Sequence, residues 1–293
     1  MIIKRLRSCP DPGLTKDGHF ELPPELHAKA CTFDFSPACS QYDWLVVQND
    51  LSKPEKLSCP VKNTIFIYGE PSSIVVYPES FLRQFAIVVS FQESIFVRHP
   101  CVIPFNMTWN WSYYATKNRY IDYDTMCNAA PPIKSKSISV VCSTKKSTEF
   151  HRHRLRFLEQ LEKLLPEIDR FGRGCAPVDA KRDVILPYRY HIAIENYQCG
   201  NYWTEKLSDA WLGYSLPFYY GASSISKWFP PESYIPIDIA DLKQSAKTIS
   251  DAINADEYSK RLPYIQEARH LLMSKYNRFL QIRKTIQKQK MEK

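Results

Sequence analysis

The sequence predicts an α/β protein made of two doubly wound domains that face a cleft. Short apolar runs alternate with amphipathic, helix-length stretches in both halves of the chain, which is typical of parallel sheets covered by helices. A proline-containing segment, 129–136 (AAPPIKSK), lies between the halves and reads as a linker. A chain of 293 residues is long enough for two cores of ordinary size.

The predicted strands of the first half are short and are separated by polar or proline-containing stretches. They cover residues 1–6, 42–47, 64–68, 85–90 and 101–105. In the second half, residues 138–142 read as a buried strand, and Thr148 can cap a helix whose leucines recur through Leu165. We therefore predict a first domain over residues 1–132, a second over 133–245, and a helical basic tail over 246–293.

Composition excludes several classes of protein. The nine cysteines include no C-x-x-C pair and no histidine at ligand spacing, so we predict reduced thiols rather than a zinc site or a disulfide framework. No apolar run has the length of a membrane span, and residues 1–6 resemble a strand rather than a signal peptide. These observations predict a cytoplasmic protein.

The net charge of +8 is concentrated in the tail, where the last 23 residues carry +6. Leu272, Tyr276, Phe279 and Ile286 recur there at helical spacing, which predicts a basic amphipathic helix. One interpretation is a peripheral anchor on the anionic inner face of a membrane. The other is an ordinary C-terminal helix that packs across both domains. Basic residues alone give only non-specific phosphate affinity, so we predict no nucleic-acid partner.

The most informative segment is 190–221, YHIAIENYQCGNYWTEKLSDAWLGYSLPFYYG. Residues 191–195 read as a buried strand and 196–201 as a polar loop. Thr204 can cap the helix that follows, which places Glu205 and Lys206 in its first turn. A helix N-terminus favours anions such as a diphosphate, and the strand, loop, helix and strand in order predict a βαβ unit.

This segment resembles the donor-binding region of family 10 fucosyltransferases. The resemblance rests on blocks in the order that the family requires, and it covers roughly residues 63–241. The blocks lie at 190–196, 202–207, 216–221 and 229–235, with further blocks at 69–73, 110–114, 154–161 and 168–174. It implies the GT-B fold, with two Rossmann-like domains, and transfer of L-fucose from GDP-β-L-fucose with inversion at the anomeric carbon.

The resemblance also implies roles for individual residues. Glu70 corresponds to the family's catalytic base, which removes the proton of the acceptor hydroxyl. Arg154 and Lys206 would neutralise the departing diphosphate, with Arg152 and Arg156 as rivals to Arg154. The remaining candidates are Glu205 for sugar hydroxyls, Asn196 and Tyr202 for weaker donor contacts, and Trp111 and Tyr113 on the acceptor side.

We expect no obligatory cofactor and no metal site, although a divalent metal could stimulate the reaction, and the short motif Asp122-Tyr-Asp124 has D-x-D form. The expected partners are GDP-fucose and an oligosaccharide or lipid-linked glycan, with O3 of GlcNAc in an N-acetyllactosamine-type glycan as the expected acceptor. Two alternatives stay open. One is a GT-B transferase that uses another nucleotide sugar such as GDP-mannose, and the other is a catalytically silent carbohydrate-binding relative.

Overall fold

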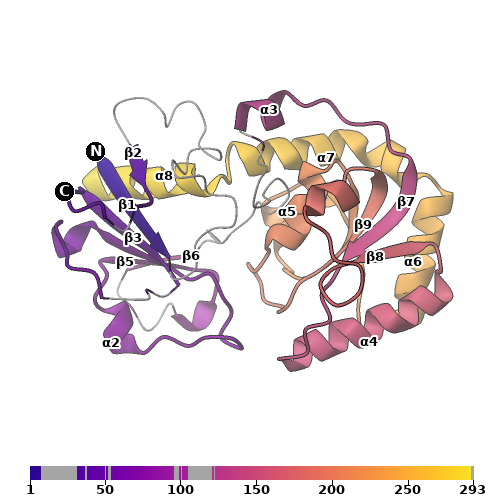
Figure 1. Cartoon of the computed structure of the whole chain (residues 1–293), viewed down its shortest axis with the longest axis horizontal. Helices are drawn as coiled ribbons and strands as arrows, with labels where there is room; N and C mark the ends of the chain where they lie inside the picture. The colour runs from indigo at the N-terminus through magenta and orange to yellow at the C-terminus, as the bar shows by residue number, and fades with distance from the viewer. Residues whose placement is uncertain are drawn as a thin grey trace. The chain divides into compact units, whose positions relative to one another are not determined.

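The chain forms two compact units in a computed structural model (Figure 1), which describes residues 1–7, 32–36, 38–49, 51, 54–95, 99, 101–104, 121 and 123–291. The first unit contains the described residues up to Ala129 together with those from Ser274 onward. The second unit runs from Ala130 to Met273. The chain therefore returns to its first unit at its C-terminal end.

The first unit is built on a parallel sheet, which among the described residues has six strands in the order β2-β1-β3-β4-β5-β6. Its central strands β3, β4 and β5 are buried along their whole length, as expected for a sheet covered on both faces. The strands are β1 (Ile2–Arg7), β2 (Thr32–Asp34), β3 (Trp44–Gln48), β4 (Thr64–Ile67), β5 (Ile87–Ser90) and β6 (Val102–Pro104).

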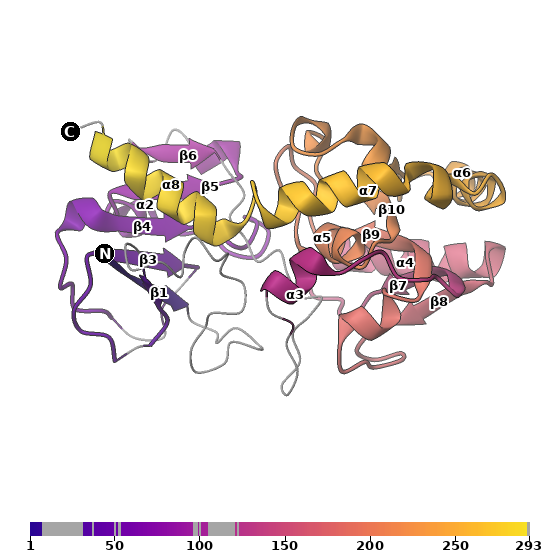
Figure 2. The same ribbon diagram turned by 90° about the horizontal axis from the view of Figure 1, so that it is seen from above.

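The C-terminal helix α8 (Arg278–Met291) packs on this sheet, and Figures 1 and 2 both place it beside the strands of the first unit. Phe279 contacts the Phe33 ring of β2 edge-on, with 5.0 Å between the ring centroids. Phe279, Ile282 and Ile286 are fully buried, whereas Lys284, Lys288 and Lys290 are exposed. The apolar face thus lies in the protein core, which supports the packing interpretation of the tail; the membrane anchor stays a prediction.

The described part of the first unit also contains the short helices α2 (Glu79–Leu82) and α3 (Tyr123–Asn128) and the 3-10 helices η1 (Val61–Asn63) and η2 (Glu93–Ile95). Rings of Phe66, Tyr77, Phe81 and Phe85 cluster between β4 and the α2 region at centroid distances of 4.9 to 5.5 Å. Aromatic rings packed in this way bury much more apolar surface than small side chains do, and this burial stabilises the unit.

The second unit is built on a parallel sheet of five strands, in the order β11-β10-β9-β7-β8 among the described residues. From β7 the chain passes to β8 on one side and then to β9 on the other, so the order reverses between β7 and β9. This is a topological switch point. The strands are β7 (Lys136–Val141), β8 (Ile168–Phe171), β9 (Tyr188–Ile194), β10 (Leu216–Tyr220) and β11 (Ile235–Pro236).

Amphipathic helices cover the second sheet. Helix α4 (Glu149–Leu164) begins at Thr148, whose hydroxyl accepts a hydrogen bond from the His151 backbone at 3.1 Å, as predicted. Helix α5 (Glu205–Leu212) connects β9 to β10 and contacts α7 (Glu257–Met273). The remaining elements are α6 (Leu242–Asn254) and the 3-10 turns η3 (Lys181–Val184), η4 (Ile225–Lys227) and η5 (Pro231–Ser233).

The α/β class with two parallel sheets is confirmed. The structure divides the predicted tail 246–293 between the units, because α6 and α7 belong to the second unit and α8 to the first. Within the described part of the chain, no helix has both the length and the apolar character needed to cross a membrane.

Candidate active site

The switch point brings together side chains from two segments of the second unit. Asn196 follows the carboxyl end of β9, and Arg154 reaches it from α4, the helix that follows β7. An Arg154 Nη1 donates to the Asn196 side-chain oxygen and also to the Ile194 carbonyl at 3.4 Å. Ligands of open α/β sheets bind at the carboxyl ends of the strands beside such a reversal. The geometry therefore places Arg154 and Asn196 where a ligand of this sheet would bind.

Arg154 is distinguished from its neighbours by burial. Its side chain is only 5% exposed, whereas Arg152 and Arg156 on the same helix are exposed. The Arg154 Nε–H has no hydrogen-bond acceptor among the described residues, so the guanidinium retains donor capacity beyond its bonds to Asn196 and Ile194. Of the three arginines considered from sequence, Arg154 is the one that contacts the switch point.

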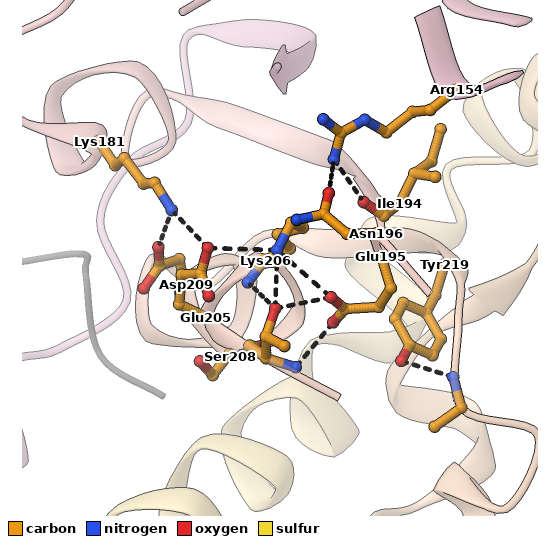
Figure 3. Close-up of polar contacts among 12 residues, drawn as sticks. Arg154, Lys181, Ile194, Glu195, Asn196, Glu205, Lys206, Ser208, Asp209 and Tyr219 are labelled. Carbon is orange, nitrogen blue, oxygen red and sulfur yellow. Dashed lines mark hydrogen bonds and ion pairs between the residues drawn. The ribbon is translucent and has the colours of Figure 1, made fainter. Parts of the chain in front are cut away.

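The N-terminus of α5 is fixed by a buried glutamate (Figure 3). Glu195 is fully buried at the end of β9, and its carboxylate accepts hydrogen bonds from the Thr204 backbone at 2.7 Å and the Thr204 hydroxyl at 2.6 Å. The Thr204 hydroxyl in turn accepts from the Lys206 backbone at 3.4 Å, which caps the helix as predicted. Glu195 thus ties the strand end to the helix start.

Lys206 lies among three oxygen-bearing side chains at this helix start. Its Nζ is 3.0 Å from the Thr204 hydroxyl, 3.3 Å from Glu205 Oε1 and 3.4 Å from Glu195 Oε2. Burial raises the pKa of the Glu195 carboxyl, and the positive charge of Lys206 opposes that rise. The Lys206 side chain is 16% exposed. It lies at the helix N-terminus, where an anion would also meet the backbone dipole.

A second lysine holds Glu205 from the opposite side. Lys181 of η3 lies 3.5 Å from Glu205 Oε1 and 3.0 Å from Asp209 Oδ2, a carboxylate that is 1% exposed (Figure 3). Burial alone would raise the pKa of Glu205, but Lys206 and Lys181 outweigh it and lower that pKa to about 2. Burial likewise opposes the charge of Lys181, yet Asp209 and Glu205 raise its pKa above the ordinary value. Glu205 is therefore ionised at neutral pH and acts as a hydrogen-bond acceptor.

Tyr202 is buried in the second unit, and its ring packs against Tyr197 at 6.1 Å between centroids.

Sequence reasoning missed Glu195, Lys181 and Asp209. A glutamate at the end of an otherwise apolar strand was the available signal for Glu195. Nothing local marked Lys181 and Asp209, which lie 28 residues apart in the chain.

Beneath the site, His191 of β9 is buried with its Nδ1 2.9 Å from the Ser139 hydroxyl of β7. Burial first, and then the charges of Lys181 and Lys134, lower the pKa of His191 to about 3. The folded chain therefore keeps His191 neutral at a pH where the unfolded chain protonates it.

This difference predicts a pH dependence of stability. The pKa of His191 is lower in the folded chain than in the unfolded chain. Its contribution to the free energy of unfolding is therefore complete above pH 6.5 and is lost progressively as pH falls toward 3. By pH 5 the loss amounts to about 2 kcal/mol. A His191→Asn variant should show a shallower decline in the free energy of unfolding between pH 6.5 and 5, measured by urea denaturation. Parallel curves for the two proteins would contradict this assignment.

In the first unit, Glu70 follows the carboxyl end of β4 and is half-buried. The turn that carries it is held by hydrogen bonds. The Gly69 backbone donates to the Asn49 side chain at 2.6 Å, and Gln92 Nε2 donates to the Glu70 carbonyl at 3.5 Å. A Cβ at Gly69 would lie 2.4 Å from Asn49 Oδ1, so the close approach of Asn49 requires glycine there.

Other predicted residues lie outside the described part of the chain: Trp111, Tyr113 and Asp122 of the D-x-D motif. Within the described part, no group of three or more His, Cys, Asp or Glu side chains could hold a metal ion. Seven cysteines there, from Cys39 to Cys199, are free thiols.

Comparison with known proteins identifies the family. The profile described as "Glycosyltransferase family 10 (fucosyltransferase) C-term" matches residues 131–291, which is more than half of the chain. The chain belongs to glycosyltransferase family 10. The matched region includes residues 131–273 of the second unit, and with them Arg154, Asn196, Glu205 and Lys206.

Two proteins with similar segments are named α-(1,3)-fucosyltransferases. FucT of Helicobacter pylori is 33% identical over 60 residues, 20% of this chain and 13% of that protein. Fut-1 of Caenorhabditis elegans is 35% identical over 108 residues, 33% of this chain and 23% of that protein. The aligned segments thus span less than a quarter of the length of either relative.

A solved structure supports the fold over nearly the whole chain. The crystal structure of an α1,3-fucosyltransferase with GDP-fucose covers 94% of this chain and 90% of its own, with a TM-score of 0.53 and 16% identity. This family 10 chain therefore has the GT-B fold, as the sequence predicted, with its two parallel sheets in separate units.

Proposed function

We propose that this family 10 member is an inverting α1,3-fucosyltransferase that moves L-fucose from GDP-β-L-fucose to a glycan hydroxyl. Family membership supports the reaction class, and the two similar sequences and the similar structure are α1,3-fucosyltransferases. The observation that carries the proposal is the meeting of Arg154, Asn196 and Lys206 around the carboxyl end of β9, beside an N-terminal helix dipole. This is a site for a diphosphate.

The donor would be bound through its charged leaving group. Arg154 offers a guanidinium fork and Lys206 an ammonium to the diphosphate, whose negative charge grows as the bond to fucose breaks. Glu205, ionised and fixed between two lysines, would accept hydrogen bonds from ribose or fucose hydroxyls. Asn196 holds Arg154 in place, and buried Tyr202 supports the loop that leads to Thr204.

Glu70 would act as the general base. Its carboxylate removes the proton of the acceptor hydroxyl while that oxygen attacks the anomeric carbon from the face opposite GDP. The bond between that carbon and the β-phosphate oxygen breaks, and GDP leaves with the electron pair. One displacement converts the β-linked donor into an α-linked product.

We propose O3 of GlcNAc in an N-acetyllactosamine-type glycan, in a surface oligosaccharide or a lipid-linked glycan, as the acceptor position. The test is GDP release by the purified chain from GDP-fucose with N-acetyllactosamine, beside GDP-mannose with the same acceptor. Turnover that requires GDP-fucose, with a 1,3-linked product by NMR, is the expected result. Turnover with GDP-mannose and not with GDP-fucose would show that the donor is GDP-mannose. If GDP-fucose neither supports turnover nor stabilises the protein, the proposal is overturned.

A further inference from the structure

The second unit contains a pocket of about 470 Å³ on the β11 side of its sheet, away from the switch point between β7 and β9. It lies at the carboxyl ends of β10 and β11, the edge of the sheet at which ligands bind. We call it the β10–β11 pocket. Its volume falls within the usual range for small-molecule sites. None of the roles assigned to the donor uses its residues.

The lining of the β10–β11 pocket combines aromatic rings with neutral and acidic hydrogen-bonding groups. Tyr220 and Tyr234 provide rings, Gln198 an amide and Asp238 a carboxylate. Aromatic faces suit the apolar C–H face of a sugar ring, while a carboxylate and an amide suit its hydroxyls. Among the described residues, no lysine or arginine lines the pocket, so its chemistry favours a neutral saccharide over a phosphate.

Two of these groups have unused hydrogen-bonding capacity. The Tyr234 side chain is 9% exposed and packs edge-on against Tyr219 at 6.0 Å, yet its hydroxyl bonds to no described residue. Asp238 is exposed and forms no ion pair with a described residue. One of its oxygens accepts from the Ala240 backbone at 2.9 Å, and its own backbone N–H donates to Ser245, which fixes the turn. A hydroxyl and a carboxylate at the pocket surface can each form a hydrogen bond with a hydroxyl group of a ligand.

The pocket shares a wall with the candidate active site. A Cβ at Gly221 would lie 2.3 Å from the Tyr219 hydroxyl and 2.5 Å from Glu195 Cγ, so these three residues are in direct contact. Glu195 is the residue that fixes Thr204 and lies 3.4 Å from Lys206. Glu195 thus lies next to both Lys206 and Gly221, a residue that lines the β10–β11 pocket.

We propose that the β10–β11 pocket binds a sugar ring of the acceptor glycan, an inference that rests on the proposed function. The fucosyl ring of the donor is bonded directly to the diphosphate and so belongs beside Lys206. We assign a ring in the β10–β11 pocket to the acceptor, because none of the residues assigned to the donor lines that pocket. The pocket would then contribute to acceptor specificity, holding a part of the glycan other than the reacting hydroxyl.

The test uses two variants that remove single polar groups without changing shape, Tyr234→Phe and Asp238→Asn. Glu232→Gln is the matched control, because Glu232 is an exposed acidic residue on the neighbouring turn η5 and does not line the pocket. We expect KM for an N-acetyllactosamine-containing oligosaccharide to rise about 3- to 10-fold in each pocket variant, with KM for GDP-fucose unchanged. The control should match wild type.

A second readout separates this inference from the proposed function. Saturation-transfer NMR on wild type without donor should show oligosaccharide binding that weakens in both variants, whether or not turnover occurs. Binding without turnover would leave the pocket in place while the fucosyltransferase proposal fails. A rise in KM for GDP-fucose instead would assign the pocket to the donor sugar and overturn the inference, as would variants that bind and turn over like wild type.

Discussion

Glu70→Gln is expected to lower kcat by roughly 10²- to 10⁴-fold while leaving the affinity for GDP-fucose unchanged. A positioned base contributes about this factor, because an acceptor hydroxyl is a poor nucleophile until its proton is removed. Glutamine keeps the shape of the side chain and cannot accept that proton. Thermal melts of the variant would verify that the turn, which is held by the bonds from Gly69 to Asn49 and from Gln92 to the Glu70 carbonyl, is intact.

The measurement combines steady-state kinetics with thermal shift by GDP-fucose. Glu79→Gln is the matched control, because Glu79 lies in the same unit at an exposed position and, among the described residues, pairs only with Arg83 four residues on. Surface pairs of this kind contribute little to stability. The variant at Glu70 should also lose the acidic limb of the pH–rate profile that the base produces. Activity within tenfold of wild type, or loss of stabilisation by GDP-fucose, would remove Glu70 from the role of base.

Local patterns in the sequence predicted the helix starts of the second unit. Thr148 and Thr204 each carry a side chain that caps a helix, and a cap depends on residues within a few positions of it. The alternation of apolar runs with amphipathic stretches predicted two parallel sheets, because this pattern is also local in the sequence. What the sequence could not supply was long-range pairing. Lys181 reads as one charge in the run Lys-Arg-Asp, and only the fold brings it to Asp209, which in the sequence reads as an ordinary helix residue.

The C-terminal tail shows a related limit. Apolar residues recur at helical spacing through Leu272, Tyr276 and Phe279, which suggests one continuous helix, but α7 ends at Met273 and α8 begins at Arg278. Asn277 marks the break, since its side-chain oxygen accepts from the Phe279 backbone at 3.0 Å. Periodicity identifies a face that must be buried and does not say against which unit. Here the burying surface is the sheet of the first unit, almost 250 residues earlier in the chain.

Arg154→Ala is expected to lower kcat/KM for GDP-fucose by roughly 10²- to 10³-fold, the usual effect of removing one donor from a developing anion. Arg156→Ala is a matched control two residues away on the same helix, where the side chain is exposed, and it should stay within about twofold of wild type. Arg154→Lys keeps the charge and loses the planar fork, so it should fall between the two. Far-UV circular dichroism and thermal melts of all three would verify folding, because Arg154 is buried.

The role of Arg154 is separated from a structural one by comparing GDP with guanosine. If the guanidinium binds the diphosphate, Arg154→Ala weakens GDP binding strongly and guanosine binding little, since only GDP carries the charge that Arg154 neutralises. If Arg154 merely holds the loop through Asn196, both ligands weaken alike, because the loop would shift for either one. Isothermal titration of the two ligands thus distinguishes charge recognition from loop support, and equal losses would contradict the assignment of Arg154 to the leaving group.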